Sequence, residues 1–306
     1  MRKKIVSDLS PFNNRSEMPA GRLAEKKLLA FLLCYIVGFG LAEGLVILLH
    51  FALGLNVFKG EQLGPRALGA ITLWGCIVPL VITLLYQMKI EKRSLAAIGV
   101  TGRPLYWLLG GAAGVLLLGL CVGGALLAGA LKYNGTGRPD ALLLCVMFAG
   151  YAIQGATEEV MSRGLVLGAL KDKVPLPLAI GASTLTFVAP HLLSMGGSDP
   201  AVMLAGVLNL VLFSVLMCLL TLRTGSLLMA CGLHSVWNFV LGSVLGISVS
   251  GGEAAENSVL ELSAKGNSLL NGGAYGLEAS IITTAVLTAA VICLLLTAKN
   301  TKKGGK

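Results

Sequence analysis

The sequence contains very little charge for its length. Asp, Glu, Lys and Arg make up 13% of the 306 residues, whereas hydrophobic residues make up 55% and the mean hydropathy is +0.82. A soluble protein of this size needs a charged surface, which so few charges do not provide. This shortage argues against a soluble globular protein and predicts a polytopic membrane protein.

Cysteine pairs and aromatic residues are also scarce. The seven cysteines all lie in apolar stretches and none belongs to a Cys-x-x-Cys pattern, so we expect neither a disulfide framework nor a zinc ribbon. Aromatic residues amount to 6%, and no basic stripe is interleaved with them. Nucleic-acid binding is therefore not expected, despite the net charge of +9.

Long apolar stretches, by contrast, recur along the whole chain. A membrane helix needs about 20 apolar residues. Eight windows qualify: 28–54, 68–88, 105–131, 141–169, 176–195, 201–222, 227–247 and 280–298. The fifth window is the weakest, because it is short and contains Pro190. The predicted fold class is all-α, a polytopic membrane helix bundle of about eight transmembrane helices.

The basic residues predict how the bundle is oriented. If the eight helices alternate in direction, one side of the membrane receives 18 Lys and Arg residues and the other side five. By the positive-inside rule, both termini are cytoplasmic. We therefore expect cytoplasmic tails at 1–27 and 300–306, and a single transmembrane domain at 28–299 in the cell (inner or plasma) membrane. The Gly-, Ser- and Asn-rich loop 248–279 is predicted to be external, with some short structure of its own.

Several polar side chains lie inside the predicted helices, where an ionisable group costs about 2.5–3.5 kcal/mol on insertion scales. They are Glu43, His50, Glu158, Glu159, Arg163, His191, Asn209, His234 and Asn238. We expect Glu43 and His50, two turns apart on one helix face, to serve a structural or helix-pairing role. Asn209 is expected to form interhelical hydrogen bonds.

The stretch ATEEVMSRG at 156–164 places two adjacent carboxylates in this apolar environment. Glu159 and Arg163 are four residues apart on one helix face and are predicted to pair. Glu158 points about 100° away from Glu159 and has no local counter-ion. It needs a partner from another helix or water, which makes it the better candidate for a general base.

Two later helices supply polar groups that such a base can use. His191 follows Phe187 by four residues, and His234 precedes Asn238 by four. Together with Glu158 they provide a base, imidazoles that can hold a water or a metal, and an amide donor for an oxyanion.

Glu158, His191 and His234 are predicted to lie at different depths in the membrane, which limits how they can come together. At 1.5 Å per residue, Glu158 lies about 17 Å, His234 about 12 Å and His191 about 22 Å from the cytoplasmic helix ends. The three meet only if the fifth helix is displaced, tilted or broken near Pro190.

These three motifs, in this order on successive helices, resemble the CPBP family of CAAX proteases and bacteriocin-processing and self-immunity proteins. They are E-E-x-x-x-R (Glu158, Glu159, Arg163), F-x-x-x-H (Phe187, His191) and H-x-x-x-N (His234, Asn238). The segment SLAAIG at 94–99 is similar to the lead-in of this family. The resemblance covers a core at about 90–247.

The resemblance implies an intramembrane endopeptidase that cuts a membrane-associated peptide or lipidated protein. By residue, it implies that Glu158 activates water with help from His191. His234 and Asn238 would stabilise the oxyanion, and Glu159, Arg163 and Phe187 would support the site. The family is described both as metalloproteases and as glutamate proteases without an obligatory metal. A zinc ion held by Glu158, His191 and His234 therefore stays open beside a metal-free glutamate mechanism.

Two alternatives to the peptidase remain. A non-catalytic membrane scaffold or immunity protein would use the polar cluster as structural glue, and a proton-coupled transporter would use Glu and His as a relay. Membrane lipid is an expected partner in every case.

Overall fold

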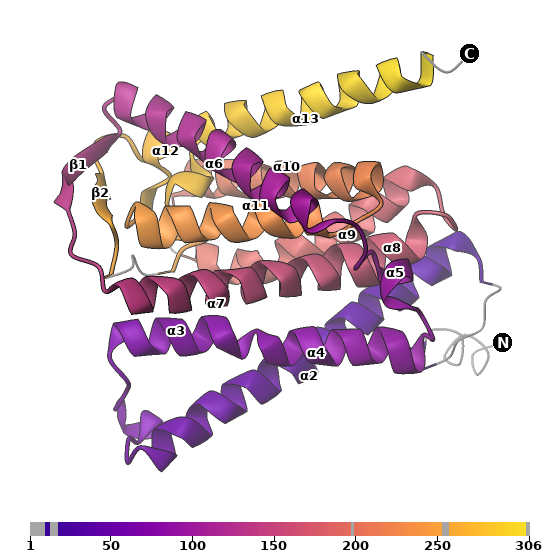
Figure 1. Cartoon of the computed structure of the whole chain (residues 1–306), viewed down its shortest axis with the longest axis horizontal. Coiled ribbons are helices and arrows are strands. Elements are labelled where there is room, and N and C mark those ends of the chain that lie inside the picture. Colours follow the sequence, from indigo (N-terminus) through magenta and orange to yellow (C-terminus); the bar gives the residue numbers. More distant parts are fainter. Residues whose placement is uncertain (1–9, 13–17, 197–198, 253–256, 304–306) are drawn as a thin grey trace.

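Long helices lie side by side in the computed structural model, which describes residues 10–12, 18–196, 199–252 and 257–303 (Figure 1). Six helical segments of the described chain are long and apolar enough to cross a membrane. They are α2 (Ala20–Ala52); α3 (Pro65–Gly75), α4 (Ile77–Leu85) and η2 (Tyr86–Ile90) as one segment; α6 (Pro104–Leu127); α7 (Ala141–Glu159), η3 (Val160–Leu167) and α8 (Gly168–Leu170) as one segment; α9 (Leu176–His191) with η4 (Leu192–Met195); and α10 (Pro200–Thr224). This architecture is that of a polytopic membrane bundle.

Two further helices have apolar stretches that are shorter than a typical span. They are α11 (Leu228–Phe239), continued by η5 (Val240–Val244), and α13 (Ile281–Lys303), which is apolar as far as Thr297. All eight predicted windows therefore form helices, but only six of the helical segments in the described chain have an apolar stretch as long as a membrane span. The first helix begins at Ala20, so residues 20–27 of the predicted tail are helical; the rest of that tail lies largely outside the described residues.

A small β-sheet was not predicted and corrects the all-α expectation. Strand β1 (Leu131–Thr136) pairs antiparallel with β2 (Leu260–Ala264). Because the strands are far apart in the sequence, no local turn pattern announces their pairing. The predicted loop 248–279 contains β2 and three short helical turns: α12 (Ser268–Asn271), η6 (Gly273–Tyr275) and η7 (Leu277–Ala279).

Local capping features mark the start of α7 and the end of α10. The Asp140 carboxylate accepts a hydrogen bond from Leu143 N at 2.9 Å and so caps the start of α7. At the end of α10, Gly225 adopts a left-handed φ of 66°, which glycine takes without a steric cost.

Helix α11 packs in the middle of the bundle, against α6, α7 and α10 (Figure 1). Glycines allow α6 and α11 to approach closely. A Cβ atom at Gly110 of α6 would lie 2.0 Å from Met229 O, and one at Gly232 of α11 would lie 2.0 Å from Trp107 O. Small residues at such crossings are typical of membrane helices. This close packing places His234 and Asn238 of α11 inside the protein.

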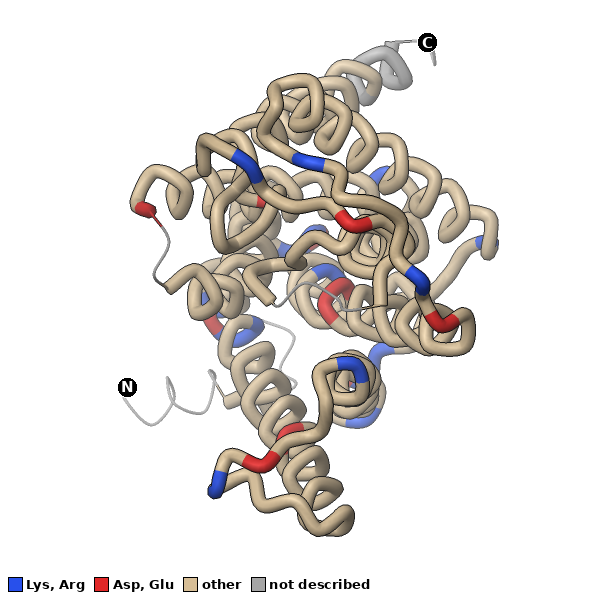
Figure 2. Tube along the Cα trace, turned by 90° about the vertical axis from the view of Figure 1, so that its left-hand side faces the viewer, with Lys and Arg blue, Asp and Glu red and all other residues tan. Residues whose placement is uncertain are grey.

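The ends of the bundle differ from each other. Helix α2 begins and α13 ends at one end, whereas β1 and β2 lie at the opposite end (Figure 1). This agrees with an even number of helices crossing the bundle. Viewed from the β-sheet end, charged residues are few and separated by uncharged chain (Figure 2). The side of the membrane on which each end lies stays a prediction.

Candidate active site

Glu159 and Arg163 form a buried ion pair. Arg163 Nη1 lies 3.3 Å from Glu159 Oε1, and both side chains are completely buried. The four-residue spacing predicted this contact, and it forms even though the helix widens into the π-helical segment η3 directly after Glu159. Because each charge compensates the other, neither is left isolated in an apolar interior.

Arg163 also connects this helix to α10 and α9. Its Nη2 donates to the backbone carbonyl and the hydroxyl oxygen of Ser214, at 3.1 and 3.0 Å. Its guanidinium carbon lies 4.7 Å from the centre of the Phe187 ring, which fits a cation–π contact. Arg163 and Phe187, two of the three residues expected to support the site, are therefore in direct contact.

Glu158 faces two other helices. Its Oε2 lies 3.7 Å from His191 Nε2 on α9 and 3.9 Å from His234 Nε2 on α11. Both distances exceed hydrogen-bond length, and within the described chain Oε2 has no hydrogen-bond partner. The Glu158 side chain is 19% exposed, against 0% for Glu159. The adjacent carboxylates thus occupy different environments, and the imidazoles that face Glu158 Oε2 come from other helices, as its position predicted.

The other nitrogen of each imidazole fixes the orientation of the ring. His191 Nδ1 lies 2.7 Å from Phe187 O, and His234 Nδ1 lies 3.0 Å from Glu159 Oε1. A carbonyl and a carboxylate accept hydrogen bonds, so both Nδ1 atoms carry protons. In neutral rings, both Nε2 atoms are then acceptors directed at Glu158. In that protonation state, the three acceptor atoms need a shared donor such as a water molecule, whereas a doubly protonated His234 ring would itself present Nε2–H as a donor.

Asn238 reaches Glu158 through an intermediate residue. Its Nδ2 donates to Gln154 Oε1 at 3.2 Å, and Gln154 Nε2 donates to Glu158 Oε1 at 3.1 Å. This relay holds the second oxygen of Glu158 and leaves Oε2 directed at the imidazoles. The Asn238 amide has a further N–H that this relay does not use.

Helix α9 brings His191 to Glu158 without a break. It continues through Pro190 to His191 and then tightens into the 3₁₀ turn η4. The α-helical geometry therefore continues past Pro190 and changes directly after His191, and α9 packs against η3 and α10.

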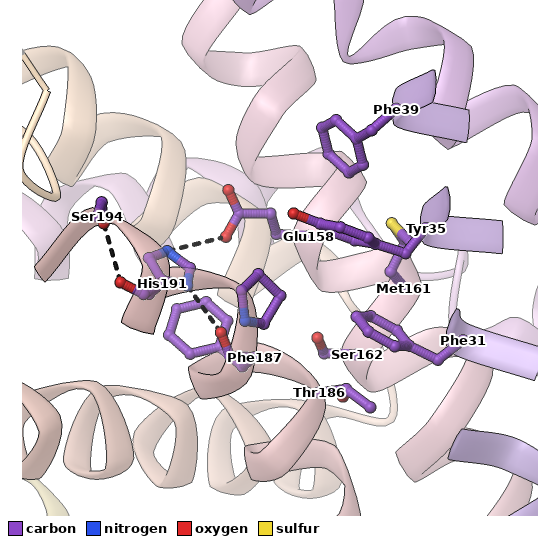
Figure 3. Close-up of a pocket in the computed structure, with 11 residues that line it drawn as sticks. Phe31, Tyr35, Phe39, Glu158, Met161, Ser162, Thr186, Phe187, His191 and Ser194 are labelled. Atoms are coloured by element: carbon purple, nitrogen blue, oxygen red, sulfur yellow. Dashed lines mark hydrogen bonds and ion pairs between the residues drawn. The ribbon is translucent and has the colours of Figure 1, made fainter. Parts of the chain in front are cut away.

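A cavity of about 210 Å³ lies beside Glu158 and His191 (Figure 3). One wall consists of three aromatic residues of α2 that follow one another at four-residue spacing: Phe31, Tyr35 and Phe39. Their rings face the helices that carry Glu158 and His191 (Figure 3). The cavity is therefore apolar on one side and carries the candidate base on the other.

The predicted zinc ligands Glu158, His191 and His234 are not arranged as a metal site. Among the residues that the structure describes, no group of three or more His, Cys, Asp or Glu side chains is arranged to hold a metal ion. We therefore derive no step through zinc, and the ligand set Glu158, His191 and His234 stays a prediction.

Three residues near the site were missed by sequence reasoning. Gln154 precedes Glu158 by one helical turn, a spacing that could have pointed to it. Ser214 had no such signal, because a lone serine in an apolar helix is common. Glu278 is more distant still: it lies in the predicted external loop, yet lines a small cavity together with His191 and His234.

The remaining polar residues of the predicted helices have other surroundings. His50 Nδ1 lies 2.8 Å from Val46 O, and His50 Nε2 accepts from Leu63 N at 3.3 Å, which supports a structural role in the turn after α2. Glu43 has an exposed side chain. Asn209 donates to the backbone carbonyls of Glu278 and Ser280, both at 2.8 Å, so it contacts the loop and the start of α13.

Comparison with known proteins identifies the segment that carries the motifs. Residues 140–240 match the family model described as type II CAAX prenyl endopeptidase Rce1-like. No curated protein and no solved structure matches the chain. The matched segment includes all seven site residues expected from the resemblance, from Glu158 to Asn238, whereas α2, α6 and the segment after 240 lie outside it. Residues 140–240 are thus an Rce1-like domain of the type II CAAX prenyl endopeptidase (CPBP) family.

Proposed function

We propose that this protein is an intramembrane endopeptidase in which Glu158 activates the attacking water. The observation that carries the proposal is the convergence of Glu158 Oε2 with His191 Nε2 and His234 Nε2, at 3.7 and 3.9 Å. Membership of residues 140–240 in a family of prenyl endopeptidases supports the same reaction class.

The catalytic water would lie between Glu158 and His191. Such a water donates one hydrogen to Glu158 Oε2 and the other to His191 Nε2, since both atoms are acceptors. Glu158 takes a proton as the water oxygen bonds to the peptide carbonyl carbon. It then returns that proton to the leaving nitrogen as the C–N bond breaks, which yields a carboxyl and an amino product.

His234 and Asn238 would stabilise the negative charge on the former carbonyl oxygen. The Glu159 carboxylate at Nδ1 favours the doubly protonated His234 ring, which then presents Nε2–H as a donor. The free N–H of Asn238 offers a second donor. Preorganised donors of this kind contribute about 10²–10³ to the rate each.

The substrate is proposed to be a membrane-associated peptide or lipidated protein. The aromatic wall of the cavity beside Glu158 and His191 is suited to an apolar group next to the cleaved bond. The name of the matched family, a prenyl endopeptidase, points to prenylated substrates. Membrane lipid surrounds the protein and is its other partner.

The test compares newly formed peptide termini in membranes that contain the wild-type protein or Glu158→Gln. We expect the glutamine variant to lose processing by about 10²–10⁴-fold, because an amide does not accept the proton of water. Glu43→Gln is the matched control, since it makes the same change at an exposed glutamate of a membrane helix. Unchanged processing by a correctly inserted Glu158→Gln protein would exclude the peptidase mechanism.

The same assay separates the two mechanisms that the resemblance leaves open. Activity that survives a strong chelator supports the metal-free glutamate mechanism. Activity that is lost in chelator and returns with added zinc supports the metal-dependent one.

A further inference from the structure

One wall of the cavity beside Glu158 belongs to α2, which lies outside the matched family segment. Phe31, Tyr35 and Phe39 follow one another by about one helical turn each, so their side chains lie on one face of α2. The Phe31 and Tyr35 ring centroids are 5.8 Å apart, and the Tyr35 and Phe39 ring centroids are 4.7 Å apart. These three residues form a continuous row, the α2 aromatic row, with Tyr35 in the middle.

This cavity is the space through which a substrate can reach Glu158. Its lining includes Glu158 and His191, whose side chains are 19% and 15% exposed. The smaller cavity of about 20 Å³ has His191 and His234 in its lining but not Glu158. That smaller space has room for about one water molecule and not for a peptide. A peptide that meets Glu158 Oε2 therefore passes the α2 aromatic row.

The Tyr35 hydroxyl is the one polar side-chain group of this row, and it points toward Glu158 (Figure 3). The two groups are close enough to interact electrostatically. The Ser194 hydroxyl, on another wall of the cavity, already donates to His191 O at 2.9 Å. Within the described chain, by contrast, no hydrogen bond uses the Tyr35 hydroxyl, so it is available to a ligand in the cavity.

A bound peptide brings polar main-chain groups against this otherwise apolar wall. Each peptide unit has a carbonyl acceptor, and a buried carbonyl without a partner costs free energy. A phenol keeps its proton at neutral pH and can donate to such a carbonyl. Phe31 and Phe39, on either side, suit apolar groups. The row therefore fits an extended peptide that has a main-chain carbonyl at Tyr35 and apolar groups beside it.

We propose that Tyr35 is a substrate-binding residue of the candidate site, whose hydroxyl donates to a main-chain carbonyl next to the peptide bond that faces Glu158. Phe31 and Phe39 contact apolar groups of the same peptide. The proposal rests on the proposed function, because Glu158 defines which bond is cleaved. It gives α2, outside the family segment, the role of fixing the position of the peptide along the site.

Tyr35→Phe isolates the hydroxyl, because it removes one oxygen and leaves a ring of the kind that already lies on both sides. The variant is made in the Glu158→Gln background, so that the peptide is not consumed. The probe is a fluorescent farnesylated peptide that ends in Cys-Val-Leu-Met, and its dissociation constant is measured by fluorescence anisotropy in nanodiscs, against empty nanodiscs. We expect the dissociation constant to rise by about two- to tenfold, the effect of one hydrogen bond.

Two analogues of the probe show whether the hydroxyl binds the peptide itself. In each, one peptide bond is replaced by an ester, whose carbonyl is a weaker acceptor. One analogue carries the ester before the cysteine, and the other carries it after the valine. We expect the effect of Tyr35→Phe to fall below about twofold for one of the two analogues. An equal rise for all three peptides would show that the hydroxyl acts on the protein alone, and that result overturns the proposal.

Tyr133→Phe is the matched control, since it makes the same change at an exposed position of β1. It should leave all three dissociation constants unchanged. An unchanged dissociation constant in Tyr35→Phe overturns the role of Tyr35, and so does the absence of saturable binding. If Tyr35→Phe does not fold, equal affinities of the Glu158→Gln protein for the three peptides would overturn the proposal equally.

This readout does not depend on cleavage, so the two proposals can fail separately. Cleavage of the same farnesylated peptide by the wild type and by Glu158→Gln is measured by mass spectrometry. Glu158-dependent cleavage, together with an unchanged dissociation constant in Tyr35→Phe, would keep the proposed function and remove the role of Tyr35. A raised dissociation constant without Glu158-dependent cleavage would keep the contact between Tyr35 and the peptide but contradict Glu158 as the base.

Discussion

At the scale of single residues, the adjacent Glu158 and Glu159 differ in the side chains that they contact. Glu158 and Glu159 have the same chemistry, yet Glu159 bonds Arg163 and His234 while Glu158 Oε2 has no hydrogen-bond partner in the described chain. A carboxylate tied to a guanidinium is a poor base, since protonation would break the pair. The free oxygen of Glu158 suits it for accepting a proton.

Gln154 is predicted to position Glu158 without contacting substrate. In Gln154→Ala, Glu158 Oε1 loses its amide donor and the carboxylate gains rotational freedom. We expect kcat to fall by about tenfold with little change in KM, because the lost interaction positions the base rather than binding substrate. Steady-state cleavage kinetics measure both constants. Gln62→Ala, at an exposed glutamine, is the control; a change confined to KM would contradict this role.

At the scale of elements, the π-helical segment η3 is held by side chains of its neighbours. Arg93 Nη1 donates to Gly164 O at 2.8 Å, and Ser183 Oγ donates to Ser162 O at 2.9 Å. Wide turns of this kind are rare and often lie at functional sites. Arg93 directly precedes the SLAAIG segment, which forms the short helix α5 (Leu95–Ile98). The SLAAIG segment, which resembles the family's lead-in, thus directly follows the arginine that contacts η3 beside the site.

Arg93→Met should destabilise this region. Methionine keeps an apolar stem but removes the donors to Gly164 O, to Gln87 Oε1 at 2.8 Å and to Ala97 O at 2.6 Å. An acceptor that loses its partner costs about 1–3 kcal/mol where it is buried, and the bonds to Gly164 O and Gln87 Oε1 are part-buried. We expect a thermal unfolding midpoint in detergent that is several degrees lower, accompanied by reduced activity. Arg103→Met, at an exposed arginine before α6, should behave like the wild type. Equal midpoints for both variants would show that Arg93 does not stabilise η3.

At the scale of the whole molecule, the orientation in the membrane follows from charge and helix number together. The ends of the described chain lie at one end of the bundle and the β1–β2 sheet lies at the other (Figure 1). The uneven distribution of Lys and Arg predicts that the terminal end is cytoplasmic. The end with the β1–β2 sheet would then be external.

Reporter fusions test this orientation. Green fluorescent protein attached after Lys306 should fluoresce, because it folds in the cytoplasm. Alkaline phosphatase inserted at Gly266, a turn residue with a φ of 70°, should be active, because its disulfides form only outside the cytoplasm. The opposite pattern, with a dark fusion and an inactive insertion, would reverse the assignment.

Local physics explains which features the sequence could predict. The eight helices follow from apolar length, and the Glu159–Arg163 contact follows from the helical period. The motif order predicted the family, which the match at 140–240 confirms, whereas the predicted core at about 90–247 is longer than the matched segment. The starts of helices are less predictable. The first apolar window begins at residue 28, whereas α2 begins at Ala20, because a helix can extend beyond its apolar stretch. The pairing of β1 with β2 has no local signal at all.

The sequence by itself determined the membrane bundle, the helical face of each polar residue and the identity of the unpaired glutamate, because these depend on composition and on a fixed helical period. Only the tertiary structure decided that Glu158 Oε2 meets both Nε2 atoms, that Gln154 links Asn238 to Glu158, and that Glu278 lies behind the imidazoles. The hydrogen bond between Gln154 and Asn238 joins residues that are 84 positions apart in the sequence. Such contacts depend on how helices tilt and approach, which side-chain volume and close glycine packing set in three dimensions.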